Sequence, residues 1–194
     1  MDCISLCGLL CNNNPKLYVE IGSGETTKFV RWSINTFGLR TKIISIDPGP
    51  RAEIDSICDL VIRKPVEKLD PQFFQDLESG DILFVDASHR VLMNSDTSVV
   101  FLDILPYLKN NVLVHFHDIF LPYDYPPEWV ERFYSEQYLL AAFILAEGDK
   151  FQIILPNFFV SLDSELAAIC SPIWDGMSYI TSHGASFWIK TINR

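Results

Sequence analysis

Two short segments hold the side chains best suited to proton chemistry. Residues 86–89 read Asp-Ala-Ser-His and residues 115–118 read His-Phe-His-Asp, and each segment completes an apolar run. Imidazole is the side chain whose ordinary pKa lies closest to neutral pH, so it can take up a proton during a reaction. His117 is therefore predicted to be a general base, with Asp118 beside it.

A glycine loop is the second feature with chemical meaning. Glu20-Ile-Gly-Ser-Gly-Glu25 follows an apolar run and opens a helical pattern. Glycines there let the backbone approach a ligand, and the first turn of a helix has N–H groups free to bind it. Asp47 ends the next apolar run, at roughly the 20-residue distance expected of a carboxylate that binds ribose hydroxyls. The loop and Asp47 together predict a site for a nucleoside-containing ligand.

This loop differs from the dinucleotide fingerprint. That fingerprint is G-x-G-x-x-G, and Thr27 stands where its third glycine would be. The simplest alternative is a strand-to-helix turn that needs glycine for its backbone alone, with Asp47 as a solvated cap of its strand.

The elements that must position these residues alternate along the chain. Strands are predicted at residues 17–21, 42–47, 60–62, 81–86, 111–117, 151–155 and 186–192. Helices are predicted at residues 26–37, 51–58, 72–77, 95–108, 128–146 and 165–170. This alternation predicts a doubly wound α/β sheet with mostly parallel strands, in which ligands bind at the carboxyl ends of the strands. Residues 1–16 are expected to be a short N-terminal segment, and residues 17–194 a single domain.

Strand geometry separates the histidines. Because side chains alternate between the faces of a strand, Leu113, His115 and His117 share one face, and Phe116 lies on the other. His115 lies deeper in the sheet and is predicted to be a buried residue bonded to a neighbour. His117 lies at the rim, where a substrate has access, whereas His183 is expected to be structural.

Composition excludes several classes of protein. The chain has 194 residues, of which 48% are hydrophobic, and that is enough for one core and too much for a disordered chain. Its net charge of −10, without a cluster of Lys and Arg, argues against a nucleic-acid partner. Five cysteines, no apparent secretory signal and no long apolar run predict a reduced, cytoplasmic protein without a membrane partner.

Together these motifs mark a resemblance to a known family. The pattern acidic-x-G-x-G at residues 20–24 resembles motif I of the class I methyltransferases that depend on S-adenosylmethionine (SAM). The segment from Val114 to Pro126, with Trp129 and Glu136 after it, is similar to the small-molecule O-methyltransferases and cephalosporin-hydroxylase-like proteins of that family. The resemblance implies a Rossmann-like, doubly wound seven-stranded α/β sheet, mostly parallel with an antiparallel last strand, and helices on both faces.

The resemblance also implies a function and its residues. The expected reaction is transfer of a methyl group from SAM to an oxygen of a small molecule or glycan, with a homo-oligomer as a possible assembly. The expected catalytic residues are His117, Asp118 and Asp86. The expected SAM-binding residues are Glu20, Gly22, Ser23, Gly24, Glu25, Asp47, Pro48, Asp86, Ser88 and His89.

Metal-dependent relatives hold Mg²⁺ with acidic residues at the positions of Asp86, His117 and Asp118. This chain departs from that pattern, since His117 replaces an oxygen ligand of the kind that Mg²⁺ prefers. A softer divalent ion is one interpretation, and His117 as a general base is the other.

Two other functions remain open from the sequence. A domain that binds SAM without catalysis fits the short N-terminal segment, because relatives usually cover the acceptor with extra N-terminal helices. An NAD-dependent oxidoreductase is disfavoured by Thr27. The metal-binding motif of metallo-β-lactamase-type hydrolases matches His115 to Asp118 poorly, because its spacing is one residue longer.

Overall fold

The computed structural model describes residues 1–146, 149–175 and 182–192. Its centre is one seven-stranded sheet with the order β3-β2-β1-β4-β5-β7-β6. The strands are β1 (Leu17–Ile21), β2 (Lys42–Ile46), β3 (Leu60–Ile62), β4 (Ile82–Val85), β5 (Leu113–Phe116), β6 (Phe151–Pro156) and β7 (Phe187–Thr191). The β1 to β5 pairings are parallel, whereas β7 is antiparallel to both β5 and β6. The predicted fold class, with its antiparallel last strand, is confirmed.

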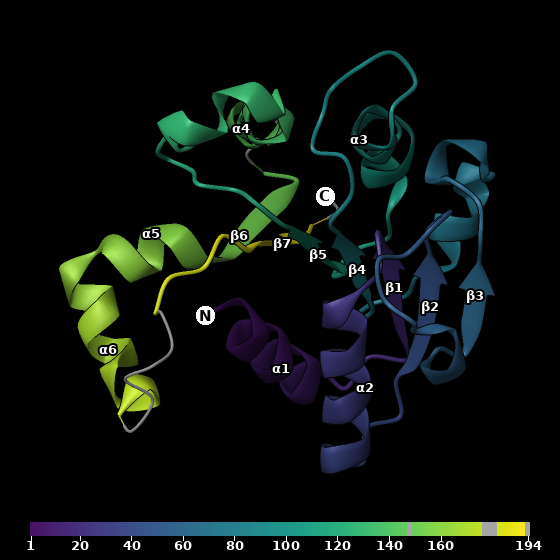
Figure 1. Cartoon of the computed structure of the whole chain (residues 1–194), viewed down its shortest axis with the longest axis horizontal. Coiled ribbons are helices and arrows are strands. Elements are labelled where there is room, and N and C mark those ends of the chain that lie inside the picture. The colour runs from purple at the N-terminus through teal and green to yellow at the C-terminus, as the bar shows by residue number, and fades with distance from the viewer. Residues whose placement is uncertain (147–148, 176–181, 193–194) are drawn as a thin grey trace.

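Two helices cover one face of this sheet (Figure 1). They are α1 (Asp2–Asn13) and α2 (Glu25–Phe37), and they pack against each other. Leu6 and Leu10 of α1 and Val30 of α2 bury against Tyr18 and Trp188 of the strands. The helix α2 ends where predicted, because Gly38 adopts φ +64° and donates its N–H to the carbonyl of Ile34.

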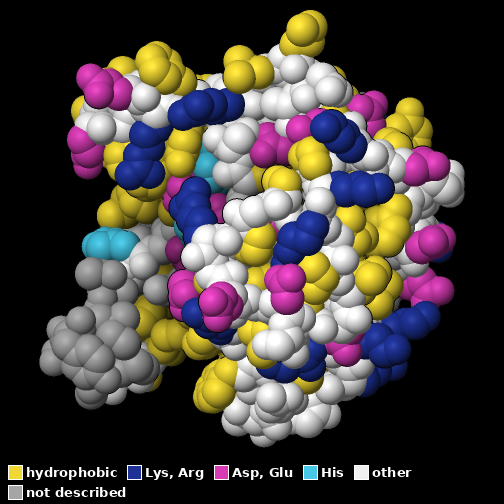
Figure 2. All heavy atoms as spheres, turned by 45° about the vertical axis from the view of Figure 1, so that its right-hand side comes forward, with side chains coloured by type: hydrophobic (Ala, Val, Ile, Leu, Met, Phe, Trp, Pro, Cys, Tyr) yellow, Lys and Arg dark blue, Asp and Glu magenta, His cyan; other side chains and the backbone are white. Residues whose placement is uncertain are grey.

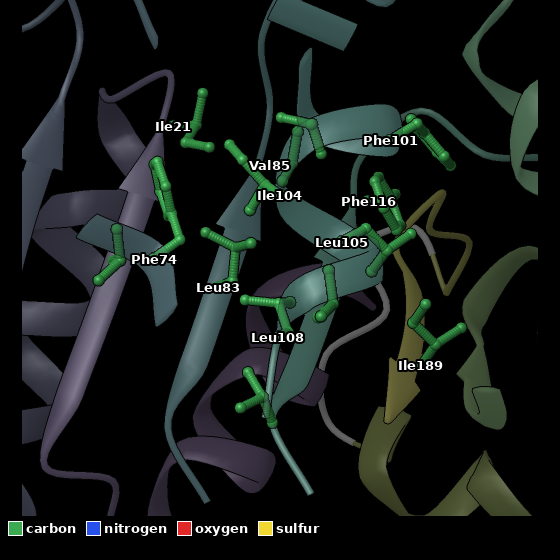
Figure 3. Packing of buried hydrophobic residues seen from close by; sticks show 14 of the residues in the cluster. Ile21, Phe74, Leu83, Val85, Phe101, Ile104, Leu105, Leu108, Phe116 and Ile189 are labelled. Atoms are coloured by element: carbon green, nitrogen blue, oxygen red, sulfur yellow. The ribbon is translucent and has the colours of Figure 1, made fainter. Parts of the chain in front are cut away.

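The opposite face buries the larger core (Figure 3). Ile21, Leu83, Val85 and Phe116 of the strands meet a helical segment that contributes Phe101. That segment comprises α3 (Asp96–Val99), a π-helical stretch η4 (Val100–Ile104) and a 3₁₀ turn η5 (Leu105–Tyr107). It begins directly after Ser95, the predicted start of this helix, and the Ser95 side chain caps it by accepting the Ser98 N–H. Alternate residues of β5 enter different cores, as the strand period predicts.

Short 3₁₀ helices connect the remaining strands on the β2–β3–β4 side. They are η1 (Asp55–Ile57), η2 (Val66–Lys68) and η3 (Pro71–Asp76). They replace the predicted helices 51–58 and 72–77, and Pro71 at the start of η3 fits its first turn. The strands also end sooner than predicted, so Asp47, Asp86 and His117 lie in the first positions after β2, β4 and β5.

The prediction of one long helix over residues 128–146 is wrong. The structure has a 3₁₀ helix η6 (Pro127–Arg132) and a separate helix α4 (Glu136–Ala146). Phe133 adopts a left-handed conformation with φ +57°, which stops the first helix. The N–H groups of Ser135 and Glu136 then donate to the carbonyl of His89, so tertiary contacts set the start of α4.

Two helices lie beyond the β6 edge of the sheet (Figure 1). The sequence predicted residues 165–170 as helical, and α6 (Ser164–Trp174) includes them. Its partner α5 (Asn157–Leu162) was not predicted, because it follows β6 without an intervening turn residue. In the described part of the chain, no helix combines the length and the apolar character needed to cross a membrane.

Candidate active site

The loop between β1 and α2 is fitted tightly against the end of β4. Gly22 adopts φ +81°, and a Cβ atom there would lie 1.8 Å from the carbonyl oxygen of Asp86. Only glycine tolerates both the left-handed backbone and this approach. Gly22 therefore sets the distance between the loop and Asp86.

The N–H groups of Gly22, Ser23 and Gly24 each have a partner within the chain. The Gly22 N–H donates to the carbonyl of Ile46 at 3.0 Å, and the Ser23 N–H donates to Asp47 Oδ2 at 2.8 Å. The Gly24 N–H donates to Thr27 Oγ1 at 3.1 Å. The loop is thus held rigidly, and these three groups are not presented to a phosphate as they are in dinucleotide sites.

Asp47 links the loop to the end of β2. Its Oδ2 accepts from Ser23, and its Oδ1 accepts from the N–H of Gly49 at 2.8 Å. A carboxylate oxygen has a second lone pair, so each oxygen of Asp47 can still accept from a ligand hydroxyl. Asp47 therefore keeps the acceptor capacity that two ribose hydroxyls require.

A cavity of about 660 Å³ opens over these residues, at the carboxyl ends of β1, β2 and β4. Its size falls in the range of small-molecule sites. The predicted residues that line it are Gly22, Ser23, Gly24, Glu25, Asp47, Pro48, Asp86 and His117. Other lining residues, among them Thr26, Arg51, Val66, Glu67 and Asp96, were not predicted. Thr26, Val66, Glu67 and Asp96 lie at the starts of α2, η2 and α3, and Arg51 lies between β2 and η1, so none of them directly follows a strand.

Glu20 lies beneath the loop and is not part of the cavity lining. Its side chain is completely buried and accepts hydrogen bonds from Tyr18 Oη, at 3.1 Å, and from Thr27 Oγ1. Burial raises the pKa of Glu20 to about 8, although these hydrogen bonds oppose the rise. Since Thr27 also accepts the Gly24 N–H, Glu20 supports the loop through Thr27.

The strand ends bring together the three residues predicted to be catalytic. His117 Nδ1 lies 3.1 Å from Asp118 Oδ1 and 3.7 Å from Asp86 Oδ1. Burial lowers the pKa of His117, but the hydrogen bond with Asp118 and the charges of Asp86 and Asp118 outweigh burial and raise the pKa to about 9. The imidazole is therefore mostly protonated at neutral pH.

A fourth charged residue reaches this group from the N-terminal helix. Asp2 Oδ2 lies 3.9 Å from His117 Nε2, so carboxylates face both ring nitrogens. Three donors fix the Asp2 carboxylate, namely the N–H groups of Ala185 and Ser186 and Nδ2 of Asn157. No local motif marks Asp2 in the sequence, so this neighbour of His117 was not predicted.

His89 is buried, shares the neighbours Asp86 and Asp118 with His117, and does not line the cavity. Its Nδ1 pairs with Glu136 Oε2 at 2.8 Å, and its Nε2 lies 3.3 Å from Asp86 and 3.7 Å from Asp118. Burial opposes protonation, yet the bonds with Asp86 and Glu136 raise the pKa of His89 to about 10. His89 therefore neutralises carboxylates from β4, β5 and α4 and is itself 4% exposed.

Two further predicted residues also lie outside the cavity lining. The backbone N–H and the hydroxyl of Ser88 both bond to Asp96, and Asp118 faces His117 and His89. His115 is buried, as predicted, with Nε2 2.7 Å from Ser186 Oγ and its ring stacked on Phe84.

The structure gives no support to the predicted ion at Asp86, His117 and Asp118. Within residues 1–146, 149–175 and 182–192, no group of three or more His, Cys, Asp and Glu side chains is arranged to hold a metal ion.

On the molecular face in Figure 2, basic side chains lie interspersed with acidic and hydrophobic ones and do not form one continuous basic patch.

The family and the fold are both identified by comparison. A family model described as a methyltransferase domain, Methyltransf_24, matches residues 19–119. No curated protein matches the chain. A structure of the plantazolicin methyltransferase BpumL, with a monoazolic desmethylPZN analog and SAH, has a TM-score of 0.57 and 13% identity, over 98% of this chain and 85% of that chain.

Two further structures have the same fold. A putative caffeoyl-CoA O-methyltransferase from Staphylococcus aureus has a TM-score of 0.53 and 13% identity, over 97% of this chain and 82% of that chain. A structure of cmcI with Mg-SAM has a TM-score of 0.50 and 16% identity, over 98% of this chain and 70% of that chain. At these identities, the structural likeness shows the fold alone.

Proposed function

The chain belongs to the methyltransferase family whose model matches it, and on that premise we propose that this SAM-dependent methyltransferase acts on a hydroxyl group of a small molecule. The observation that carries the proposal is the position of His117. It stands at the edge of the cavity that also contains the glycine loop and Asp47. A proton acceptor thus adjoins the place proposed for SAM.

In this proposal the cavity holds SAM along the ends of β1 and β2. Asp47 would accept from the ribose hydroxyls, and Gly22 and Gly24 would hold the methionine part. Bound SAM supplies a methyl group on a positively charged sulfur. Asp86 follows β4 beside Gly22 and lines the same cavity as His117. These residues would hold SAM where the proposed base is within the same cavity.

His117 is the proposed base. The acceptor oxygen forms a bond to the methyl carbon as the carbon–sulfur bond breaks, the sulfur keeps that electron pair, and the hydroxyl proton passes to His117. Since carboxylates raise the pKa of His117 to about 9, the ring must first lose its own proton. Asp118 and Asp86 orient the ring through Nδ1, and positioning of this kind supplies much of the rate.

The same geometry argues against the two other functions. A dinucleotide needs loop N–H groups for its pyrophosphate, and those of Gly22, Ser23 and Gly24 are already bonded within the chain. A non-catalytic module has no need of a histidine held between carboxylates beside the cavity. Because no arrangement suited to a metal ion is found in the described residues, the proposal has no metal step.

The acceptor class is proposed from the named relatives. One is a methyltransferase in complex with a desmethylPZN analog, and another is a putative caffeoyl-CoA O-methyltransferase. Both act with small molecules, and the name of the second specifies an oxygen acceptor. A small molecule with a hydroxyl group is therefore the acceptor that we propose.

The first experiment measures SAH binding. A ligand that binds only the folded state raises the melting temperature by mass action, so SAH should raise it and NAD should not. Absence of any shift with millimolar SAH and folded protein would contradict the proposal. A second experiment follows label from methyl-tritiated SAM into small hydroxyl compounds, with His117→Ala as the control that should lose transfer.

A further inference from the structure

A continuous chain of polar side chains runs beneath the glycine loop. It begins with Arg63, which follows β3, and passes through Ser45 of β2 to Ser23 of the loop. Ser23 is also a hydrogen-bond partner of Glu20, which in turn binds Thr27. The chain of contacts therefore crosses three neighbouring strands below the proposed SAM site.

The distances show that these contacts are direct. Arg63 Nη1 donates to Ser45 Oγ at 3.2 Å and to the carbonyl oxygen of Asp47 at 3.0 Å. Ser45 Oγ lies 2.8 Å from Ser23 Oγ. The other terminal nitrogen of Arg63, Nη2, pairs with Asp55. The Arg63 guanidinium thus binds both Ser45, beneath the loop, and the backbone of Asp47, the proposed ribose-binding residue.

The hydrogen-bonded side chains beneath the loop are shielded from water. Ser45 and Glu20 are fully buried, and Ser23 is nearly so. In such surroundings a hydroxyl that loses its partner has no water to replace it, so its neighbours shift to find new ones. A change at Ser45 would therefore be felt at Ser23, whose backbone N–H also binds Asp47.

We propose that Arg63 and Ser45 are positioning residues for SAM, which hold the glycine loop and Asp47 in their binding arrangement from beneath. Neither is among the described residues that line the cavity. The inference rests on the SAM site proposed above and adds two residues to it. Ser45 acts on the loop through Ser23, whereas Arg63 acts on both the loop and Asp47.

This division of roles predicts different effects on two ligands. SAH has an amino-acid part, and 5′-methylthioadenosine lacks it. Ser45→Ala should weaken SAH binding about tenfold and leave 5′-methylthioadenosine within about twofold, because Asp47 keeps its hydrogen bonds with Arg63 and Gly49. Arg63→Gln should weaken both ligands about tenfold, because the Asp47 backbone also loses its donor.

Arg31 offers a matched control. Like Arg63, it binds one backbone carbonyl and one carboxylate. Its Nε donates to the carbonyl of Ile57, and its Nη2 pairs with the Asp59 carboxylate. Its side chain is 22% exposed, close to the 27% of Arg63, but its partners Ile57 and Asp59 precede β3 and are not part of the glycine loop. Arg31→Gln should lower the melting temperature without a change in SAH affinity.

The test is isothermal titration of the full chain with SAH and with 5′-methylthioadenosine, after each variant has been shown to be folded. Arg63→Lys is a second variant, in case Arg63→Gln fails to fold. Lysine keeps the positive charge and has a single donor nitrogen, so this variant should bind SAH more tightly than Arg63→Gln and more weakly than the wild type. The inference is overturned if folded Arg63 and Ser45 variants bind SAH within twofold of the wild type, or if Arg31→Gln loses as much affinity as Arg63→Gln. Absence of SAH binding by the wild type would instead overturn the proposed function, and this inference with it.

Discussion

Asp2 and His117 lie 115 positions apart in the chain numbering, yet Asp2 Oδ2 approaches His117 Nε2 to 3.9 Å. The first turn of α1 is therefore part of the candidate active site. Gly184 makes this approach possible, because a Cβ atom at that position would lie 2.2 Å from Asp2 Oδ1. The short N-terminal segment at residues 1–16 thus supplies a charge to the proposed base.

Asp2→Asn should lower the pKa of His117. The carboxylates of Asp118, Asp86 and Asp2 together hold that pKa at about 9, and the variant removes one of the three charges without a change of shape. The measurement is the titration of the His117 ring protons by NMR. Gly184→Ala should shift the titration in the same direction, since it displaces the Asp2 carboxylate. An unchanged His117 titration in both variants would show that Asp2 has no electrostatic effect.

The cluster around His89 should make stability depend on pH. Its pKa is raised from 6.5 to about 10 in the folded protein, so its contribution is fully present below pH 6.5 and is lost as pH rises through about 10. The free energy of unfolding should therefore fall over this interval, as measured by urea denaturation at several pH values. The neutral double variant His89→Gln/Glu136→Gln is the comparison, and its slope should be smaller. Equal slopes would mean that another group is responsible.

Asp47→Ala should weaken SAH binding by one to two powers of ten, or roughly 1.4–2.8 kcal/mol. The ribose hydroxyls lose a charged acceptor, and the Ser23 N–H loses its partner within the chain. Asp47→Asn keeps one oxygen and should lose less. Calorimetric titration of both variants with SAH measures the effect. If Asp47→Ala binds SAH with the wild-type dissociation constant, Asp47 only caps its strand and does not bind the ligand.

Gly22→Ala should destabilise the fold by more than about 1 kcal/mol, because alanine is incompatible with φ +81° and its Cβ would meet the Asp86 carbonyl. The free energy of unfolding in urea measures this loss. Gly8→Ala is the control, since Gly8 lies within α1 and a Cβ there meets nothing within 4 Å. That variant should be as stable as the wild type or more so, because alanine favours a helix.

Local patterns in the sequence were sufficient for the sheet and for one side of the site. Apolar runs of strand length and glycine stops depend on neighbours a few residues away, so the seven strands and the end of α2 at Gly38 were predicted. Asp86 and His117 follow adjacent parallel strands, and their meeting follows from that order alone. The glycine loop and Asp47 were found in the same way.

Other features depend on contacts between distant segments, which no local pattern encodes. The break at Phe133 has this origin, because the start of α4 is set by hydrogen bonds to His89. The same holds for the pairing of His89 with Glu136 and for the support that Arg63 gives to Ser45. The sequence by itself determined the family, through the resemblance of its glycine loop to motif I. It also determined the sheet and the strand ends that carry the chemistry, because these follow from short-range periodicity. Only the tertiary structure decided which charges surround each histidine, because an imidazole's pKa depends on carboxylates that folding brings within a few ångströms.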